Sequence, residues 1–179
     1  MIPASGELTF PSWAMNIDGP SGLDSVRIEP LYIEAAPIWV TLKSQHGVLT
    51  SVKLGLRRPE GRVNKPLVVH VLKKILLGEI PPGTGLSFQV SGTAFQQRVW
   101  AETCRIPSGS VITYGTLARK VGCGSARAVG QALKTNPLPI IIPCHRVVGA
   151  NGKLTGFSSG LKIKKMLLEF ESEHKEAAK

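Results

Sequence analysis

Residues 113–137 read TYGTLARKVGCGSARAVGQALKTNP, and this stretch predicts two short helices joined by a tight turn. Leu117 and Val121 recur at helical spacing in the first helix. Two glycines predict a turn of about four residues, and Ser125 is a suitable N-cap for a second helix that continues through Leu133. An Asn-Pro pair then ends it. Two short helices joined by such a turn are typical of a helix-turn-helix.

The second of these helices has an apolar side and a polar side. The apolar side carries Ala128, Val129, Ala132 and Leu133, and the other side carries Arg127, Gln131 and Lys134 with Gly130 beside them. The glycine would let a nucleic-acid backbone approach closely. A solvated face of an ordinary helix has the same pattern, but the basic sequence around it favours contact with DNA.

Positive charge is concentrated in the second half of the chain. Residues 1–90 carry 9 Lys and Arg against 7 Asp and Glu, whereas residues 91–179 carry 13 against 5. A one-sided basic field attracts polyanions, of which nucleic acid is the commonest. A general solubility feature of a basic proteome is the alternative, and we favour nucleic acid.

The N-terminal half, residues 1–90, is predicted to be a small α/β domain with no catalytic constellation. Residues 1–29 are rich in Pro, Gly and Ser and predict irregular structure. The runs 31–44 and 47–56 are rich in β-formers and predict a hairpin, and 67–77 has helical periodicity. The predicted fold is therefore an N-terminal α/β domain, with a small antiparallel sheet plus a helix. A mostly α-helical C-terminal domain with the helix-turn-helix follows at 91–179.

A third stretch, PIIIPCHRVVG at 139–149, carries the most reactive side chains. Three isoleucines predict a buried strand, and a proline before Cys144 predicts a turn. An ordinary thiol, with a pKa of about 8.5, is only a few per cent thiolate at neutral pH, so a nucleophilic cysteine needs a proton acceptor. His145 is adjacent, although neighbouring side chains of a strand point to opposite faces, so a turn or a bridging water would be needed. A buried structural cysteine beside a surface histidine is the alternative.

An imidazole that acts as a base needs a partner to fix its tautomer. The C-terminal run 162–179 predicts an amphipathic helix whose apolar face carries Ile163, Met166, Leu167 and Phe170. Glu171 lies at the edge of this face, where a carboxylate is either a half-exposed flank residue or an inward partner. General statistics favour the flank. Arg146 would add positive potential or hold local structure by a salt bridge.

The composition and the N-terminal sequence predict the cellular compartment. No run of about 18 apolar residues predicts a membrane span. The N-terminus does not have the pattern of a secretory signal, and the three scattered cysteines predict a reducing compartment. We therefore expect a protein that is not secreted and is cytoplasmic, or nuclear if eukaryotic. No pair of cysteines has C-x-x-C spacing, so we expect no metal, and we expect no cofactor.

Several separated motifs, in order, resemble one family. IPCHRVVG, preceded by SARAVGQALKTNP and followed by TGFSSGLKIKKMLLEFE, closely resembles the O-6-alkylguanine-DNA alkyltransferases, also called methylated-DNA–protein-cysteine methyltransferases. The match extends over about 92–171. The resemblance implies irreversible transfer of an alkyl group from O-6 of guanine in double-stranded DNA to Cys144, once per protein molecule, after base flipping. We expect a monomer, with clustering on DNA left open.

The resemblance also implies roles for individual residues. His145 would activate Cys144 through a water, Glu171 would orient His145, Asn136 would brace the turn around the site, and Tyr114 would turn the target phosphate and protonate the leaving guanine. The implied DNA contacts are Arg127, which would replace the flipped base, with Tyr114, Ser125, Ala126, Gly130, Gln131 and Lys134. The implied guanine pocket consists of Val147, Phe157, Ser158 and Ser159, together with backbone carbonyls of Cys144 and Val147.

Two positions depart from the usual family pattern. Phe157 stands where many members have Tyr, and Ser159 where many have Gly, so a bulkier loop could restrict large adducts.

Three other interpretations of the function compete with the alkyltransferase. A lesion sensor without the cysteine is disfavoured by Cys144, and a helix-turn-helix regulator leaves PCHR unexplained. A papain-like hydrolase would need Cys and His on separate elements.

Overall fold

The computed structural model describes residues 26–33, 37–45, 48–64, 68–79 and 87–174. The elements of the sheet-containing part are β1 (Val26–Leu31), β2 (Ile38–Gln45), β3 (Val48–Gly55), α1 (Val68–Leu76) and β4 (Ser87–Phe88). Those of the helical part are α2 (Ala94–Cys104), β5 (Ile112–Thr113), α3 (Tyr114–Lys120), α4 (Ala126–Lys134), the 3-10 helix η2 (Cys144–Arg146), β6 (Val147–Val148), the 3-10 helix η3 (Ala150–Gly152) and α5 (Leu161–His174).

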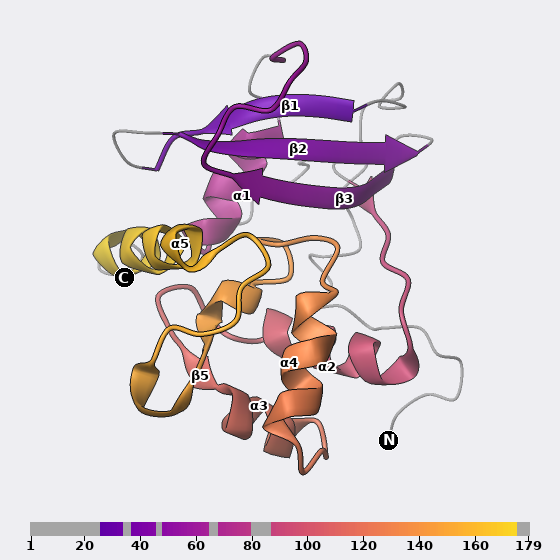
Figure 1. Ribbon diagram of the computed structural model, residues 1–179, viewed down its shortest axis with the longest axis vertical. Helices are drawn as coiled ribbons and strands as arrows, with labels where there is room; N and C mark the ends of the chain where they lie inside the picture. The colour runs from indigo at the N-terminus through magenta and orange to yellow at the C-terminus, as the bar shows by residue number, and fades with distance from the viewer. Residues whose placement is uncertain (1–25, 34–36, 46–47, 65–67, 80–86, 175–179) are drawn as a thin grey trace.

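The sheet has the order β1-β2-β3-β4, and its first three strands are antiparallel (Figure 1). In β2, Ile38, Val40 and Leu42 are buried and alternate with less buried residues, because successive side chains of a strand point to opposite faces. The hairpin of β2 and β3 confirms one prediction. Another was wrong: the run 31–44 is not one strand, since Leu31 ends β1 and Ile38 begins β2.

Strand β1 also corrects the prediction of irregular structure over 1–29, because residues 26–29 belong to the sheet. Residues 1–25 lie outside the described residues. Composition misled here because Pro, Gly and Ser in the preceding segment obscured the short alternation of apolar and charged residues in VRIEPL. Inside β1, the buried Glu29 accepts a hydrogen bond from Val69 N at 3.0 Å, at the start of α1. A carboxylate at this position stabilises the free N–H groups and positive end of the helix.

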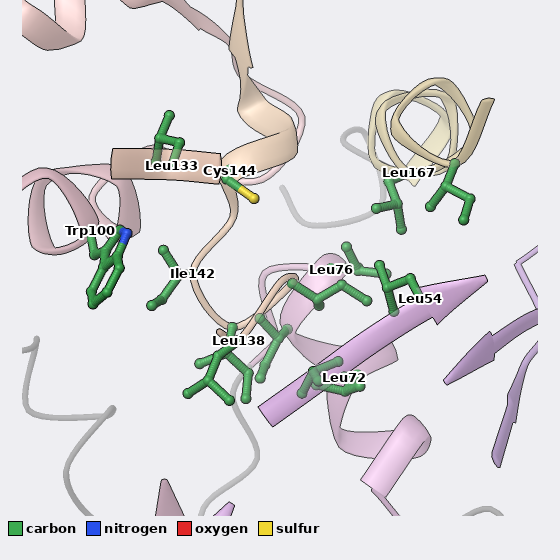
Figure 2. Packing of buried hydrophobic residues seen from close by; sticks show 14 of the residues in the cluster. Leu54, Leu72, Leu76, Trp100, Leu133, Leu138, Ile142, Cys144 and Leu167 are labelled. Carbon is green, nitrogen blue, oxygen red and sulfur yellow. The ribbon is translucent and has the colours of Figure 1, made fainter. Parts of the chain in front are cut away.

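Helix α1 confirms the predicted periodicity, and its buried residues include Val68, Leu72 and Leu76. It ends before Gly78, whose φ of 75° lies in the left-handed region that glycine adopts without strain. Figure 2 shows Leu72 and Leu76 close to Leu54 of β3, and these residues share one hydrophobic core with Leu167 of α5. The sheet and the helices below it therefore pack against a common core.

The helix-turn-helix prediction is confirmed by α3 and α4. The Ser125 hydroxyl accepts a hydrogen bond from Ala128 N at 3.2 Å, which caps α4 as expected. Gly122, with φ of 68°, turns the chain between the two helices. Helix α2 begins after Thr93 in a capping box and is tied to α4 by Trp100 Nε1, which donates to the Ala132 carbonyl at 2.9 Å.

The predicted isoleucine strand is wrong. Residues 139–142 form a turn closed by a single bridge between Pro139 and Ile142, and Ile140 has a φ of 79°. The backbone of this run is bonded locally, since Ile142 N donates to the Leu138 carbonyl at 2.8 Å and the Ile142 carbonyl accepts from Cys144 N at 2.7 Å. The three isoleucines are nevertheless buried, as an apolar run requires.

None of the helices in the described part of the chain is long and apolar enough to cross a membrane. The division of the chain after residue 90 stays a prediction. It agrees with the positions of β4, the last strand of the sheet, and of α2, which starts at Ala94.

Candidate active site and DNA-binding face

Two short strands bring distant segments of the chain together. Strands β5 and β6 pair in parallel, with Ile112 opposite Val147 and Thr113 opposite Val148. Tyr114, the first residue of α3, follows β5 directly, and η2 with Cys144 precedes β6. This pairing therefore fixes the start of the helix-turn-helix beside the segment that carries the cysteine.

Cys144 begins the 3-10 helix η2 and is only 4% exposed. Figure 2 shows it in the segment that follows Leu138 and Ile142, beside the common core. The side-chain amide of Asn136 donates to Cys144 Sγ at 3.1 Å and to the Ile142 carbonyl at 2.9 Å. Asn136 Oδ1 in turn accepts from Leu138 N at 2.9 Å. Asn136 thus braces the turn and places an N–H against the sulfur.

The resting thiol is protonated at neutral pH. Burial raises the pKa of the Cys144 thiol to about 11, although the Asn136 hydrogen bond and the positive charge of Lys164 act in the opposite direction. Desolvation wins because a thiolate loses its water shell in an apolar site. Any nucleophilic reaction of this sulfur therefore needs a proton acceptor at the moment of attack.

His145, the next residue of η2, points to a different partner. His145 and Glu171 are fully or almost fully buried, and His145 Nε2 lies 2.8 Å from Glu171 Oε1. A carboxylate only accepts, so Nε2 carries the proton and Nδ1 of neutral His145 is an acceptor. Nδ1 is buried and has no hydrogen-bond partner among the described residues. The 3-10 helix, which has Pro143 at its N-cap, agrees with the turn that this proline predicts before Cys144.

Glu171 is the centre of a buried ionic cluster, so of the two alternatives the inward partner is the one present, and not the half-exposed flank that general statistics favour. Its carboxylate accepts from Arg146 Nε at 3.0 and 3.1 Å, from Arg146 Nη2 at 2.7 Å and from Gly109 N at 3.1 Å. Arg146 Nη1 also donates to the Ile106 carbonyl at 2.6 Å. Of the two roles open for Arg146, the salt bridge is the one present.

The charges of this cluster determine the protonation of His145. Burial lowers the pKa of His145, and Glu171 only partly opposes it, because Arg146 has already balanced the carboxylate. Burial also raises the pKa of Glu171, but the hydrogen bonds and charges of His145 and Arg146 outweigh burial and lower it overall. At neutral pH the cluster therefore holds a neutral imidazole next to an ionised carboxylate.

Lys164 was missed in the sequence. It is fully buried, and its ammonium donates to the carbonyls of Val147 at 2.6 Å and Thr155 at 2.7 Å. It also lies 5.7 Å from the centroid of the Tyr114 ring. Burial lowers the pKa of Lys164 to about 8. Its spacing of seven residues from Glu171 on one helix was the available signal, because that spacing places both side chains on one face.

Tyr114 holds the loop that leads to α5. Its hydroxyl donates to the carbonyls of Gly156 at 2.9 Å and Thr155 at 3.2 Å. Gly156 has a φ of 53°, and a Cβ there would lie 3.0 Å from Tyr114 Oη. The close contact explains a glycine at this position. Burial raises the pKa of Tyr114, so the phenol is a proton donor at neutral pH.

Apart from Tyr114, which begins α3, the residues predicted to contact DNA lie on α4 and its N-cap. Ser125, Ala126, Arg127, Gln131 and Lys134 are exposed, and Gly130 is partly buried. Opposite them Val129, Ala132 and Leu133 are buried against the core. The predicted two-sided helix is therefore present.

A cavity of about 630 Å³ opens beside this surface. Its walls include the predicted residues Tyr114, Ala126 and Arg127, and the other walls are Thr113, Gly115, Gly149, Ala150 and Asn151. None of these five was predicted as a site residue, and the sequence of the last three carries no signal beyond a turn. The cavity lies between the N-termini of α3 and α4 and the segment that follows β6.

The four predicted pocket residues, Val147, Phe157, Ser158 and Ser159, are not part of that lining. Val147 is fully buried, and its carbonyl is the acceptor for Lys164. Phe157 packs against the core, Ser158 is exposed and Ser159 is partly exposed. Within the described residues, no three His, Cys, Asp or Glu side chains group as metal ligands.

This arrangement combines a buried thiol, a neutral imidazole fixed by a carboxylate, and a basic helix-turn-helix. The first two can support attack by sulfur, with the imidazole as proton acceptor. The third supplies an exposed basic surface suited to a polyanion.

Comparisons with known proteins agree with this geometry. The family model described as "6-O-methylguanine DNA methyltransferase, DNA binding domain" matches residues 94–173. A methylated-DNA–protein-cysteine methyltransferase of Methanosarcina mazei is 56% identical over 81 residues, which are 45% of this chain and 51% of that protein. One from Mycobacterium tuberculosis is 51% identical over 87 residues, 48% of this chain and 53% of that protein. The chain thus spans about half the length of these curated relatives.

Two solved structures resemble more of the chain. The crystal structure of Mycobacterium tuberculosis OGT in complex with DNA has a TM-score of 0.67 and 35% identity, and the match covers 83% of this chain and 93% of that one. The O6-methylguanine-DNA methyltransferase of Pyrococcus kodakaraensis has a TM-score of 0.68 and 30% identity, with coverage of 82% and 99%. The similarity therefore includes the sheet-containing part as well as the helices.

Proposed function

Because the chain belongs to the methylated-DNA–protein-cysteine methyltransferase family, we propose that it repairs duplex DNA by taking a methyl or other alkyl group from O-6 of guanine. The acceptor is the sulfur of Cys144, and each molecule reacts once. The observation that carries the proposal is the buried Cys144 thiol next to the His145–Glu171 pair, on a chain with a basic helix-turn-helix.

The proposed reaction is a displacement at the alkyl carbon. The bond between sulfur and carbon forms while the bond between O-6 and carbon breaks, and guanine is the leaving group. The thiol proton passes to His145 Nδ1 through a water, since Nε2 is already engaged with Glu171 at 2.8 Å. Tyr114 donates a proton to the leaving guanine, which departs neutral. The proton taken up by His145 then returns through solvent to the Tyr114 phenolate, so that only the thioether and neutral guanine are new.

Asn136 and Lys164 have a supporting part in this step. Both stabilise negative charge on the sulfur, through the hydrogen bond at 3.1 Å and through the ammonium charge. In a site with little water such fixed donors stabilise developing charge more than they would in solvent.

The target guanine must leave the duplex to reach the sulfur, and unstacking costs a few kcal/mol. We propose that Arg127, at the exposed N-terminal end of α4, fills the gap that the base leaves. Small residues at 126 and 130 let α4 approach the minor groove, where little sequence readout is available. Ser125, Gln131 and Lys134 contact the backbone.

Tyr114 and Val147 have partners that the substrate must share or replace. Tyr114 has to release the carbonyls of Thr155 and Gly156 to reach a phosphate or base. The carbonyl of Val147 accepts from Lys164, and its second lone pair remains for a guanine amino group. Phe157, Ser158 and Ser159 would complete the pocket around the flipped base. The proposal places the protein with the cell's DNA, as a monomer.

The test is a single-turnover reaction with duplex DNA that carries one O-6-methylguanine, followed by peptide mass spectrometry. We expect the mass of one methylene group on the peptide with Cys144, saturating at one per protein. Cys144→Ala should bind the duplex and gain no mass, and the matched control Cys104→Ala should react normally. Tight lesion-selective binding without mass gain would instead indicate a lesion sensor and refute the proposal.

A further inference from the structure

The sheet has an outer face that points away from the helices and carries several cations. Trp39, Thr41 and Lys43 alternate with the buried residues of β2, and Lys53 of β3 lies opposite Thr41 in the register. They therefore share the face opposite the one that packs on the core. Lys43 and Lys53 are both exposed.

The segment after β3, residues 56–64, lies over this same face. Ile28 of β1 pairs with Thr41, so it points outward, and the ideal Cβ position of Gly61 is 3.0 Å from Ile28 Cδ1. The guanidinium of Arg58 lies 5.9 Å from the centroid of the Trp39 ring. These contacts place Arg58 over Trp39, on the face that carries the two lysines, and Arg57 and Arg62 belong to the same exposed segment.

We call Lys43, Lys53, Arg57, Arg58 and Arg62 the sheet patch. All five are exposed, and none forms an ion pair with an acidic side chain in the described part of the chain. Within residues 56–64, Glu60 is the one exposed acidic residue. Arg27 is excluded because it is paired with Glu29 at 3.0 Å. Clustered cations without counter-charges create a positive potential that attracts a polyanion.

The sheet patch is far from the helix-turn-helix. The sheet lies at one end of the longest axis of the molecule, and α3 with the lower end of α4 lies at the other (Figure 1). Because the two surfaces lie at opposite ends of the molecule, we take a nucleic acid at the patch to be a different segment from one bound at the N-terminal end of α4.

We propose that the sheet patch binds the phosphates of a second duplex DNA segment, so that one protein molecule bridges two duplexes. Charge complementarity favours a polyanion, and the choice of duplex DNA rests on the proposed function. The contact reads no sequence, because it is made to phosphates by flexible cationic side chains.

The test is a bridging assay. Biotinylated duplex on beads is loaded with the full chain, washed, and offered a second, fluorescent duplex. We expect the wild-type protein to retain the second duplex at low salt. R57Q/R62Q should lose most of this retention, and K43Q/K53Q should lose it as well. The control R105Q/K165Q removes the same charge from exposed residues outside the patch and should retain the second duplex.

Salt dependence and activity separate this proposal from the function proposed above. Loss of two phosphate contacts should reduce the slope of log K against log salt for the second duplex by about 2. The rate of methyl transfer from a short duplex, long enough to bind only one protein molecule, should be the same in R57Q/R62Q as in the wild type. This rate reports on the proposed function alone.

Three outcomes would overturn the proposal. The first is a wild-type chain that is saturated by one duplex and retains no second one. The second is a control variant that loses as much retention as R57Q/R62Q does, which would indicate general charge rather than the patch. The third is displacement of the second duplex by single-stranded RNA or polyglutamate more effectively than by unlabelled duplex, which would assign the patch to another partner.

Discussion

Glu171→Gln is the substitution that most directly separates the structural and chemical parts of the buried cluster. The carboxylate accepts from His145, from Arg146 and from Gly109 N, at distances between 2.7 and 3.1 Å. Glutamine keeps the shape of the side chain but loses its negative charge. Its amide NH2 group would also point at N–H groups, which cannot accept a hydrogen bond from it. Arg146, which is 5% exposed, would then remain as a buried cation without an anion.

The size of the effect follows from that uncompensated charge. Removing one partner of a buried ion pair costs about 3–5 kcal/mol. Domains have a total unfolding free energy of about 5–15 kcal/mol, so the variant keeps only part of its stability. With a urea m-value of about 2 kcal/mol per molar, the unfolding midpoint should fall by roughly 2 M. Circular dichroism in a urea series measures this shift.

The double variant R146M/E171Q tests the explanation. It removes both charges, so it should recover much of the midpoint that Glu171→Gln alone loses. The methyl-transfer rate should not recover, because His145 still has no carboxylate to fix its tautomer. General base catalysis contributes about 10²–10⁴-fold, which bounds that loss. An unchanged midpoint in Glu171→Gln, or an equally low one in the double variant, would refute the reasoning.

The same urea series at different pH values checks the protonation states. The pKa of Glu171 is lowered by its partners, so its stabilising effect is present above its ordinary pKa and disappears as pH falls through the lowered value. The pKa of His145 is also lowered, so the unfolded chain takes up a proton first and stability declines as pH falls below about 6.5. The urea midpoint of the wild-type protein should therefore fall on acidification. The part of this decrease that occurs below the ordinary pKa of a glutamate should be absent in Glu171→Gln.

Two further substitutions test individual contacts. Asn136→Ala removes the N–H bound to Cys144 Sγ, so the thiol pKa should rise and alkylation by iodoacetamide should slow in a pH series; an unchanged profile would show that the hydrogen bond is immaterial. Gly156→Ala places a Cβ 3.0 Å from Tyr114 Oη at a φ of 53°, so it should lower the thermal unfolding midpoint by several degrees. In the control Gly130→Ala the new Cβ lies 3.8 Å from the same ring, and the midpoint should not fall. Equal midpoints in the two variants would contradict the proposed strain.

Local signals in the sequence were sufficient for the helix-turn-helix. A serine cap, a glycine turn and helical spacing act over a few residues, and Ser125 and Gly122 do in the structure what their chemistry predicts. The apolar face of α5 was equally readable, since Ile163, Met166 and Phe170 are all buried.

The errors have a common cause in contacts between distant segments. Glu171 is buried because Arg146, 25 residues earlier, supplies its counter-charge, and general burial statistics do not include that partner. The isoleucine run resembles a strand, but a strand needs a neighbour to pair with, and Ile142 is bonded locally to Leu138 and Cys144 instead. Lys164 is buried because the carbonyls of Val147 in β6 and of Thr155 in the loop before α5 accept its protons, and these distant acceptors cannot be predicted from helical spacing.

In the proposed reaction the protein is consumed, so the resting state of Cys144 matters as much as its reactivity. A thiol with a pKa of about 11 and 4% exposure is mostly protonated at neutral pH and is shielded from electrophiles in solution. The same burial strengthens the interactions of Asn136 and Lys164 with any negative charge that forms on the sulfur, because a low dielectric strengthens attraction as well as the cost of desolvation. Burial therefore disfavours the free thiolate while it favours the sulfur in the transition state, where His145 takes the proton and the charge moves on to the guanine. Selectivity for the flipped base then depends on which electrophile can reach the sulfur in line, and a thiol activated in advance by a low pKa would lose that selectivity.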